Sequence, residues 1–450
     1  MKEIYKYSEL INDLEFQIAE DTYREGDKLP SIRELALRYD CNKSTVIRAL
    51  QDLQDKHLIY AASKSGYYVM KRSGERKEEG AHWIDFAASA PDPDIFPYLD
   101  FQHCINKAID MYRKDLFIYG TPQGLPSLIR EMQRQLASYQ VFADPKQIFI
   151  TSGVQQALGL LTRIPFPNGR ERVLIEQPSY PLFMEYLKTY GIETEGIQRS
   201  DDGVDLNELE RFFKTGEFKF FYTVPRFHNP LGVSYTRNQK KAIAQLAATY
   251  DVYIVEDDYM ADLEQDAKQD PIYAYDNTSH VIYLKSFSKI IFPGLRVGVA
   301  VLPEVLCESF NRFKRLMDID SSMLSQAALE LYLKSGMFER HRKKMRSCYG
   351  KRSMLLHDSI VREVNAASEQ YYSYRPASQL GVHTYLKLAD NLRAEQIIKR
   401  LQKKSIRVEM ADSGYLPYFA KKERILKLNV SSVKEPDIPS GIEQVIREIR

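Results

Sequence analysis

Residues 286–298 read SFSKIIFPGLRVG, and this stretch carries the strongest chemical signal in the chain. It follows the strand-like run VIYLKS and flanks Lys289 with hydroxyl side chains, with Arg296 seven positions further on. A lysine that forms a Schiff base needs a desolvated or cationic setting that lowers its pKa, and a phosphate group needs hydroxyl and guanidinium donors. A lone lysine is usually a solvated surface charge, but Ser286 and Arg296 supply those donors close to Lys289. The stretch therefore predicts a lysine-centred site at the end of a strand.

Two further segments place suitable groups at a helix start and at a strand end. TSGVQQAL joins a strand to a helix, so the backbone amides near Val154 and Gln155 can bind phosphate at the helix N-terminus. VEDDY ends a buried strand, where Asp257 can pair with a protonated pyridine nitrogen and keep the ring an electron sink. Both groups are ones that pyridoxal phosphate needs.

The ring of such a cofactor also needs partners for its phenolic oxygen and for its face. HNPLG offers the amide of Asn229 beside a turn, and VEDDY offers the phenol of Tyr259; both suit that oxygen. Tyr180, in EQPSYP, can stack on the ring. Together, these segments predict a pyridoxal 5'-phosphate site with Lys289 at its centre.

Strand-like runs alternate with helical patterns over most of the chain. QIFITS, RVLIEQ, FKFFYTV, VYIVED, VIYLKS and VGVAVL are rich in β-type residues, and patterns such as NQKKAIAQLAATY lie between them. This alternation predicts an α/β domain with a largely parallel sheet. From about residue 340, a long charged helix, QLGVHTYLKL, a second helix and RILKLNV predict a smaller α+β lobe over residues 340–450.

The N-terminal region has a different pattern. Residues 8–24 place apolar side chains at helical spacing, and GDKLP then ends that helix. Ser31, with Glu34 three residues later, predicts a capping box for the helix SIRELALRYD, and Asn42 can cap the helix KSTVIRALQDLQDKHL. LIYAASKSGYYVM has strand-type residues on either side of KSG, which indicates a hairpin. Three helices and a hairpin describe a winged helix-turn-helix.

In a helix-turn-helix, the start of the second helix faces the base edges in the major groove. Here that start reads CNKST, and residues 28–72 carry nine basic against four acidic side chains, which suits a surface that meets phosphate. For Asn42 and Ser44, helix capping and base contact remain alternatives that can coexist. The residues that we expect to contact DNA are Arg33, Asn42, Lys43, Ser44, Thr45, Lys64 and Gly66.

Composition sets the broad class of the protein. The chain has 450 residues, of which 44% are hydrophobic and 28% charged, as in ordinary globular proteins. No run approaches the roughly 18 to 20 apolar residues of a membrane helix, and the N-terminus lacks the apolar stretch of a secretory signal. The four cysteines show no C-x-x-C spacing, which argues against disulfides and against a metal site. We therefore expect a cytoplasmic protein without membrane contact.

The polar run KRSGERKEEG, residues 71–80, has no apolar period and is typical of a linker. It divides the chain into three parts. We expect a DNA-binding domain over residues 1–70, a linker over 71–82, and an α/β effector domain over 83–450.

The run from LPSIRELALRYD to KSGYYV resembles the winged-helix DNA-binding domain of the GntR family, through its PSxRxLA, STV and GYYV elements. By that resemblance, most of the DNA-contacting residues given above lie where the family touches DNA. Beyond the linker, YGTPQG, SGVQQAL, QPSY, HNPLG, EDDY, SFSK, FPGLR and LKLNVSS occur in the order of fold-type I aminotransferases. The chain thus resembles the MocR-like subgroup, in which such a domain follows a GntR domain.

The resemblance implies a role for each site residue. Lys289 would form the internal aldimine, Asp257 would pair with the ring nitrogen, and Tyr180 would stack on the ring. Asn229 and Tyr259 would contact the phenolic oxygen. The phosphate would be bound by Gln155, Ser286 and Arg296, and by Tyr119 reaching across from the partner subunit of a homodimer.

Three residues depart from the family pattern. The family stretch L-R-L-x-F-S reads LKLNVS here, so Lys427 stands where an arginine usually grips the α-carboxylate of an amino acid. An ammonium is a point charge and cannot form the two parallel hydrogen bonds that a guanidinium makes to a carboxylate. Leu182 occupies a position where one type of regulator has a second carboxylate-binding arginine, and Ser89 replaces a usual glycine. The cofactor site is complete, whereas the amino-acid site is not.

Three functions fit these observations. The first is a transcriptional regulator that binds a double-stranded DNA operator as a homodimer and senses an amine, an amino acid or pyridoxal phosphate, with Lys427 in the effector site. The second is a working aminotransferase with a DNA-binding extension, and the third is a scaffold with a vestigial site. Lys289, Asp257 and Arg296 argue against the third, and Lys427 argues against the second. We therefore expect a regulator with negligible turnover.

Overall fold

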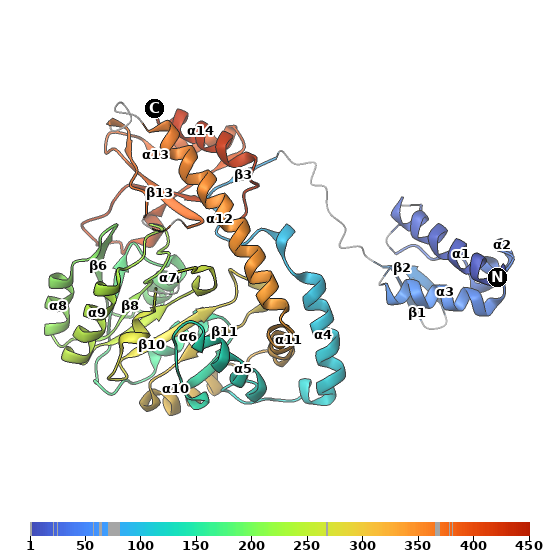
Figure 1. Cartoon of the computed structure of the whole chain (residues 1–450), viewed down its shortest axis with the longest axis horizontal. Coiled ribbons are helices and arrows are strands. Elements are labelled where there is room, and N and C mark those ends of the chain that lie inside the picture. The colour runs from blue at the N-terminus through green and yellow to red at the C-terminus, as the bar shows by residue number, and fades with distance from the viewer. Residues whose placement is uncertain are drawn as a thin grey trace. The chain divides into compact units, whose positions relative to one another are not determined.

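The structure is a computed structural model that describes residues 2–20, 22–24, 26–56, 58–62, 65–70, 82–266, 269–364, 370–377, 379 and 381–450. The chain divides into two compact units, Met1–His82 and Trp83–Arg450 (Figure 1). Residues 71–81 of the expected linker lie outside the described residues, and only His82 lies within them. Lys64, one of the expected DNA contacts, lies outside the described residues as well.

The N-terminal unit consists of three helices and a two-stranded sheet. Its elements are α1 (Lys2–Ala19), α2 (Ile32–Arg38), α3 (Lys43–Asp55), β1 (Ile59–Ala62) and β2 (Gly66–Val69). The two strands are antiparallel. Apolar residues of all five elements form one buried core, including Leu14, Leu35, Leu50, Ile59 and Val69. This arrangement confirms the winged helix-turn-helix that the sequence predicts.

The turn between α2 and α3 is defined by local backbone chemistry. Ser31 and Glu34 form the predicted capping box at the start of α2. After α2, Asp40 adopts a φ of 45°, in the left-handed region that Asp and Asn tolerate better than most residues. Asn42 holds the N-cap position of α3, as the sequence predicts, although its side chain makes no capping hydrogen bond there. Ser44 lies inside α3 rather than at its cap.

The second unit is built on an eight-stranded sheet of order β4-β11-β10-β9-β8-β5-β6-β7. Strands β10, β9, β8, β5 and β6 are mutually parallel, whereas β11 is antiparallel to both of its neighbours and β7 is antiparallel to β6. The strands are β4 (Ile148–Thr151), β5 (Arg172–Gln177), β6 (Thr194–Ser200), β7 (Gly203–Val204), β8 (Phe218–Thr223), β9 (Tyr253–Asp257), β10 (Val281–Ser286) and β11 (Gly298–Val301). This confirms the predicted α/β fold.

Helices cover both faces of this sheet (Figure 1). One face packs against α6 (Val154–Arg163), α7 (Pro181–Thr189) and α10 (Glu304–Asp318). The other face packs against α8 (Leu206–Lys214) and α9 (Arg237–Tyr250), and against α4 (Tyr98–Tyr112), α5 (Pro126–Ala137) and α11 (Met323–Lys334). Because side chains alternate along a strand, neighbouring apolar residues such as Phe220 and Phe221 of β8 pack on opposite faces of the sheet.

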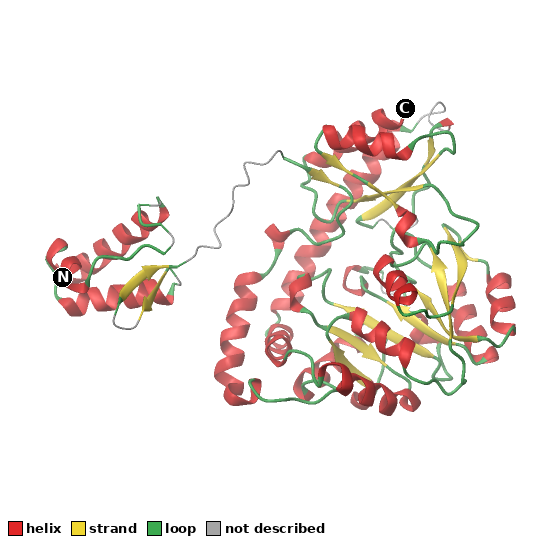
Figure 2. Cartoon of the chain, turned by 180° about the vertical axis from the view of Figure 1, so that it is seen from behind, coloured by secondary structure: helices red, strands yellow, loops and turns green. Residues whose placement is uncertain are grey.

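The smaller lobe has a sheet of its own, of order β12-β13-β16-β15, and Figure 2 shows its strands as a separate group. Its elements are α12 (Met337–Glu363), β12 (Tyr372–Ser373), β13 (His383–Leu388), α13 (Ala394–Lys403), β14 (Ile406–Arg407), β15 (Glu409–Met410), β16 (Ile425–Asn429) and α14 (Asp437–Ile449). β3 (Ile84–Asp85), from the start of the unit, pairs with β14. No described helix is long and apolar enough to cross a bilayer.

Candidate functional site

The predicted site residues gather where strands of the large sheet end. Parallel strands place their carboxyl ends at one edge of a sheet, which is where ligands bind in open α/β folds. β5, β8, β9 and β10 are mutually parallel, so the residues at and after their ends meet there. These residues are Tyr180 after β5, Asn229 after β8, Asp257 at the end of β9, and Ser286 and Lys289 at and after the end of β10.

Lys289 is a half-buried amine with an unexpected partner. Its Nζ donates to the backbone carbonyl of Ser89 at 2.5 Å and lies 3.1 Å from the Ser89 hydroxyl. Burial lowers the pKa of Lys289 to about 8, so a sizeable fraction of the amine is neutral near physiological pH. A neutral amine is the nucleophilic form. Ser89, which replaces the usual glycine, thus touches the central residue of the site.

Asp257 presents an unused carboxylate oxygen in a buried position. Its Oδ2 accepts a hydrogen bond from the Tyr222 hydroxyl at 2.9 Å, while its Oδ1 has no hydrogen-bond partner among the described residues. Burial raises the pKa of Asp257 to about 7. A buried carboxylate without a full set of partners is costly, and a cationic ring nitrogen is a group that would satisfy it.

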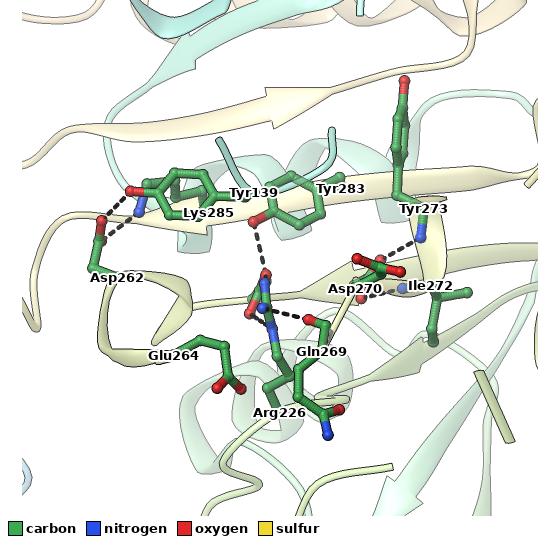
Figure 3. Close-up of polar contacts among 12 residues, drawn as sticks. Tyr139, Arg226, Asp262, Glu264, Gln269, Asp270, Ile272, Tyr273, Tyr283 and Lys285 are labelled. Atoms are coloured by element: carbon green, nitrogen blue, oxygen red, sulfur yellow. Dashed lines mark hydrogen bonds and ion pairs between the residues drawn. The ribbon is translucent and has the colours of Figure 1, made fainter. Parts of the chain in front are cut away.

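The other two acids of VEDDY lie on the opposite face of the strand. Glu256 accepts the first two backbone amides of the turn Ile272–Tyr275, at 2.8 and 2.9 Å. Asp258 pairs with Arg226 and accepts the hydroxyl of Tyr283 at 2.7 Å, within the buried polar network of Figure 3. Both acids therefore serve the structure, and strand alternation places Asp257 on the other face of β9, the one that α6, α7 and α10 cover.

A cradle of donors lies at the start of α6. Arg296 donates from Nη2 to the carbonyl of Ser152 at 2.9 Å. Gly153 has a φ of 89°, and a Cβ there would lie 2.9 Å from the same guanidinium nitrogen. A Cβ on Gly298 would lie 2.8 Å from the backbone nitrogen of Val154. The two glycines therefore let the guanidinium and the start of β11 approach the helix N-terminus, an arrangement that suits a phosphate dianion.

The remaining cofactor-site candidates, Gln155, Tyr119 and Ser286, differ in their exposure to solvent. Gln155 is exposed on the first turn of α6, and Tyr119 is 79% exposed. The Ser286 hydroxyl accepts the backbone amide of Ser288 at 3.1 Å.

Two tyrosines flank the strand ends. Tyr180 is the N-cap residue of α7, and burial raises its pKa, with a smaller contribution from the nearby charge of Asp257. Tyr259 donates its hydroxyl to the backbone carbonyl of Phe227 at 2.9 Å, two residues before Asn229. This bond holds the Asn229 loop against the end of β9.

A cavity of about 230 Å³ lies between the Tyr180 segment and the small lobe, and we call it the Lys427 cavity. Lys427, on β16, pairs there with Glu409 on β15 at 2.7 Å. Leu182 and Ser89 also line the cavity, so all three departures from the family pattern lie around the same space. Its lining comprises Ala87, Ser89, Ser179, Tyr180, Pro181, Leu182, Asn229, Pro230, His383, Thr384, Glu409, Ala411, Ser413, Gly414, Lys427, Leu428 and Asn429.

Sequence reasoning missed the partners in this region. Tyr222 lies in a uniformly buried strand, and only the alternation shared by β8 and β9 signals that it faces Asp257. Glu409 belongs to no motif, and Ser89 lies 200 residues from Lys289 in the chain. No local pattern identifies such contacts, because they join residues that are far apart in the chain.

Four of the seven DNA-contact candidates lie around one hollow on the N-terminal unit. Arg33, Asn42, Lys43 and Ser44 are exposed and line a single hollow, together with Lys6. Thr45 is half-buried and does not line it. Gly66 begins β2 with a φ of 121°, beside the side chain of Lys28. A row of donors at the start of a second helix is the usual geometry for reading a major groove.

Two family models match the chain, each over a different part of it. Residues 81–422 match the family "Aminotransferase class I and II", and residues 6–69 match "Bacterial regulatory proteins, gntR family". Among solved structures, the kynurenine aminotransferase of Pyrococcus horikoshii, in complex with PMP, superposes with a TM-score of 0.74. It is 26% identical and covers 82% of this chain and 91% of its own.

Curated relatives carry both parts or only the second. The HTH-type transcriptional regulator YcxD of Bacillus subtilis is 54% identical over 99% of this chain and 100% of its own length. Aromatic-amino-acid aminotransferase 1 of Thermococcus litoralis is 27% identical over 82% of this chain and 88% of its own. The chain therefore belongs to the aminotransferase class I and II family and, with its N-terminal gntR-family domain, is a MocR-like transcriptional regulator.

Proposed function

We propose that this regulator binds an operator through its N-terminal unit and binds pyridoxal phosphate and a small-molecule effector through its aminotransferase-like unit. The observation that carries the cofactor proposal is the buried Oδ1 of Asp257, which no described residue satisfies. The amine of Lys289, with a pKa lowered to about 8, lies at the same edge of the sheet. These groups fit the cofactor, since it carries one group that needs an anion and one that needs an amine.

Different residues of this site would hold different groups of the cofactor. Asp257 would pair with the ring nitrogen, Lys289 would provide the amine, and Arg296 and the α6 amides would bind the phosphate. When bound, pyridoxal phosphate supplies an aldehyde that reacts with amines and a ring that withdraws electrons. Ser89 would orient the Lys289 amine, because its carbonyl and hydroxyl both lie within hydrogen-bond distance.

The first prediction tests the regulator against the aminotransferase alternative. We expect purified protein with bound pyridoxal phosphate to change its absorbance when effector is added, but to show negligible multiple turnover with common α-amino acids and 2-oxoglutarate. Loose anchoring of a carboxylate costs more in turnover than in binding, on the order of 10²-fold for a displacement of about 1 Å. Steady-state assays over an amino-acid panel measure this, and robust turnover with any member would make the protein an enzyme.

The second prediction concerns DNA. We expect Lys43→Ala to weaken operator binding and to reduce the slope of log affinity against log salt by about one, because one phosphate contact is lost. Lys56→Ala is the matched control, since Lys56 lies at the other end of α3 and pairs with Glu15. Electrophoretic or fluorescence titrations at several salt concentrations give the slope. An unchanged slope with weaker binding would assign Lys43 to a base instead.

The third prediction is that the protein forms a homodimer. Phe117 and Ile118 are exposed, as are Leu316 and Met317 at the end of α10. The backbone amide of Gly120 donates to the Asp320 carboxylate, so the two apolar groups lie close together. An exposed apolar patch of this kind typically marks an interface, and Tyr119 lies within it, as its proposed reach into a partner's site requires. Sedimentation at micromolar concentration is expected to give a dimer, and a monomer would refute it.

A further inference from the structure

We propose that Glu409 sets the ligand class of the Lys427 cavity, so that the cavity takes primary amines that carry no carboxylate. This inference rests on the proposed function, in which the cavity holds the effector. The regulator would then respond to an alkylamine or hydroxyalkylamine rather than to an α-amino acid.

The register of the small sheet sets the pairing of Lys427 with Glu409. The two residues stand directly opposite each other in the antiparallel register of β15 and β16, and their charged atoms lie 2.7 Å apart. Side chains at facing positions on adjacent strands are neighbours whatever rotamers they adopt. The Lys427 side chain is 18% exposed and that of Glu409 48%, so the cation is the more buried partner. The position that grips a carboxylate in the family therefore already has its anion.

No second cation is available in the described lining of this cavity. Apart from the paired Lys427, the only basic side chain that lines it is His383. Burial lowers the pKa of His383 to about 4, with smaller contributions from Lys289 and Lys427, so this ring is neutral near pH 7. Its Nε2 lies 3.0 and 3.1 Å from the carbonyls of Phe227 and His228, which fixes the proton on that nitrogen. The ring is therefore not an anion-binding group.

A ligand carboxylate would meet unfavourable charge in this cavity. Placed on Lys427, it would lie within a few ångströms of the Glu409 carboxylate, and like charges at that range repel each other. Leu182, Pro230 and Leu428 offer apolar contact instead, and Ser89 and Thr384 offer hydroxyls. An uncharged alkyl or hydroxyalkyl tail is thus complementary to the lining, while the amine end is the group that reaches Lys289 and the cofactor.

Four-carbon ligands that differ in one group provide the test. Full-length protein loaded with pyridoxal phosphate is titrated with 1-aminobutane, L-2-aminobutanoate and 4-aminobutanoate, and affinity is measured by absorbance change and by calorimetry. We expect 1-aminobutane to bind at least tenfold more tightly than either carboxylate. In Glu409→Gln, L-2-aminobutanoate is expected to gain at least tenfold in affinity, while 1-aminobutane stays within about twofold.

The control is Glu423→Gln. Glu423 forms an ion pair with Lys387, also at 2.7 Å, on the same small lobe but outside the cavity lining. The Glu423→Gln variant is expected to bind each of the three ligands with the affinity of the natural protein.

Three outcomes would overturn the inference, and they separate it from the proposed function. Tighter binding of the carboxylates by the natural protein, or an affinity for L-2-aminobutanoate that does not rise in Glu409→Gln, would refute the role of Glu409 while leaving the cofactor proposal intact. Failure of the protein to bind pyridoxal phosphate at all, seen as the absence of its absorbance after dialysis, would refute both.

Discussion

Lys289→Ala is expected to abolish covalent attachment of pyridoxal phosphate while both units stay folded. Lys289 supplies the amine in the proposed site, and its contacts to Ser89 are the hydrogen bonds that the substitution removes. Some cofactor would still bind non-covalently through Arg296 and the amides of α6, because these groups do not depend on Lys289. We expect the variant to lose its response to effector and to keep its affinity for DNA.

Borohydride reduction followed by mass spectrometry measures the covalent adduct directly. The natural protein is expected to gain the mass of the reduced cofactor, and Lys289→Ala to gain none. Lys146→Ala, at an exposed lysine, serves as the control and should behave as the natural protein. A cofactor adduct that survives in Lys289→Ala would show that another lysine carries it.

Asp257→Asn is expected to stabilise the cofactor-free protein above pH 7 and at the same time to reduce cofactor affinity by at least 10²-fold. The pKa of Asp257 is raised to about 7 by burial, whereas an unfolded aspartate has a pKa near 4. Between these values the folded protein keeps a proton that the unfolded chain has released, so stability falls as the pH rises from about 4 to about 7. An amide has no charge to desolvate, and it therefore removes this loss.

Thermal unfolding of cofactor-free protein at pH 5 and pH 8 checks the first half of this prediction. The midpoint of Asp257→Asn should exceed that of the natural protein by several degrees at pH 8 and by less at pH 5, since about 1 kcal/mol corresponds to about 2–4 °C in domains of roughly 150–250 residues. Asp202→Asn is a control of opposite sign, because the Arg375 ion pair lowers the pKa of Asp202. Equal midpoints at pH 8 would mean that burial of the Asp257 carboxylate does not destabilise the cofactor-free protein. An unchanged cofactor affinity in Asp257→Asn would mean that Asp257 does not bind the cofactor.

The cofactor side of the site was within reach of sequence reasoning. Asp257 ends β9 and Lys289 follows β10, and the carboxyl ends of parallel strands meet at one edge. Arg296 precedes β11, which is antiparallel to β10 and therefore begins at that same edge. Alternation along a strand also separates the middle acid of VEDDY from its two neighbours, before any contact is known. The helix-turn-helix was equally accessible, because capping boxes and turn residues act within a few positions of each other.

What the sequence determined by itself was therefore everything that depends on short-range pattern: the two folds, the strand ends that carry Lys289 and Asp257, and the polar start of α3. Only the tertiary structure decided which groups these residues meet. The register of β15 against β16 places Glu409 on Lys427, and the packing of the first loop of the unit places Ser89 on Lys289. Such contacts join distant parts of the chain through non-local pairing, which no local pattern encodes, and they turn an apparent carboxylate-binding position into one that already holds its anion.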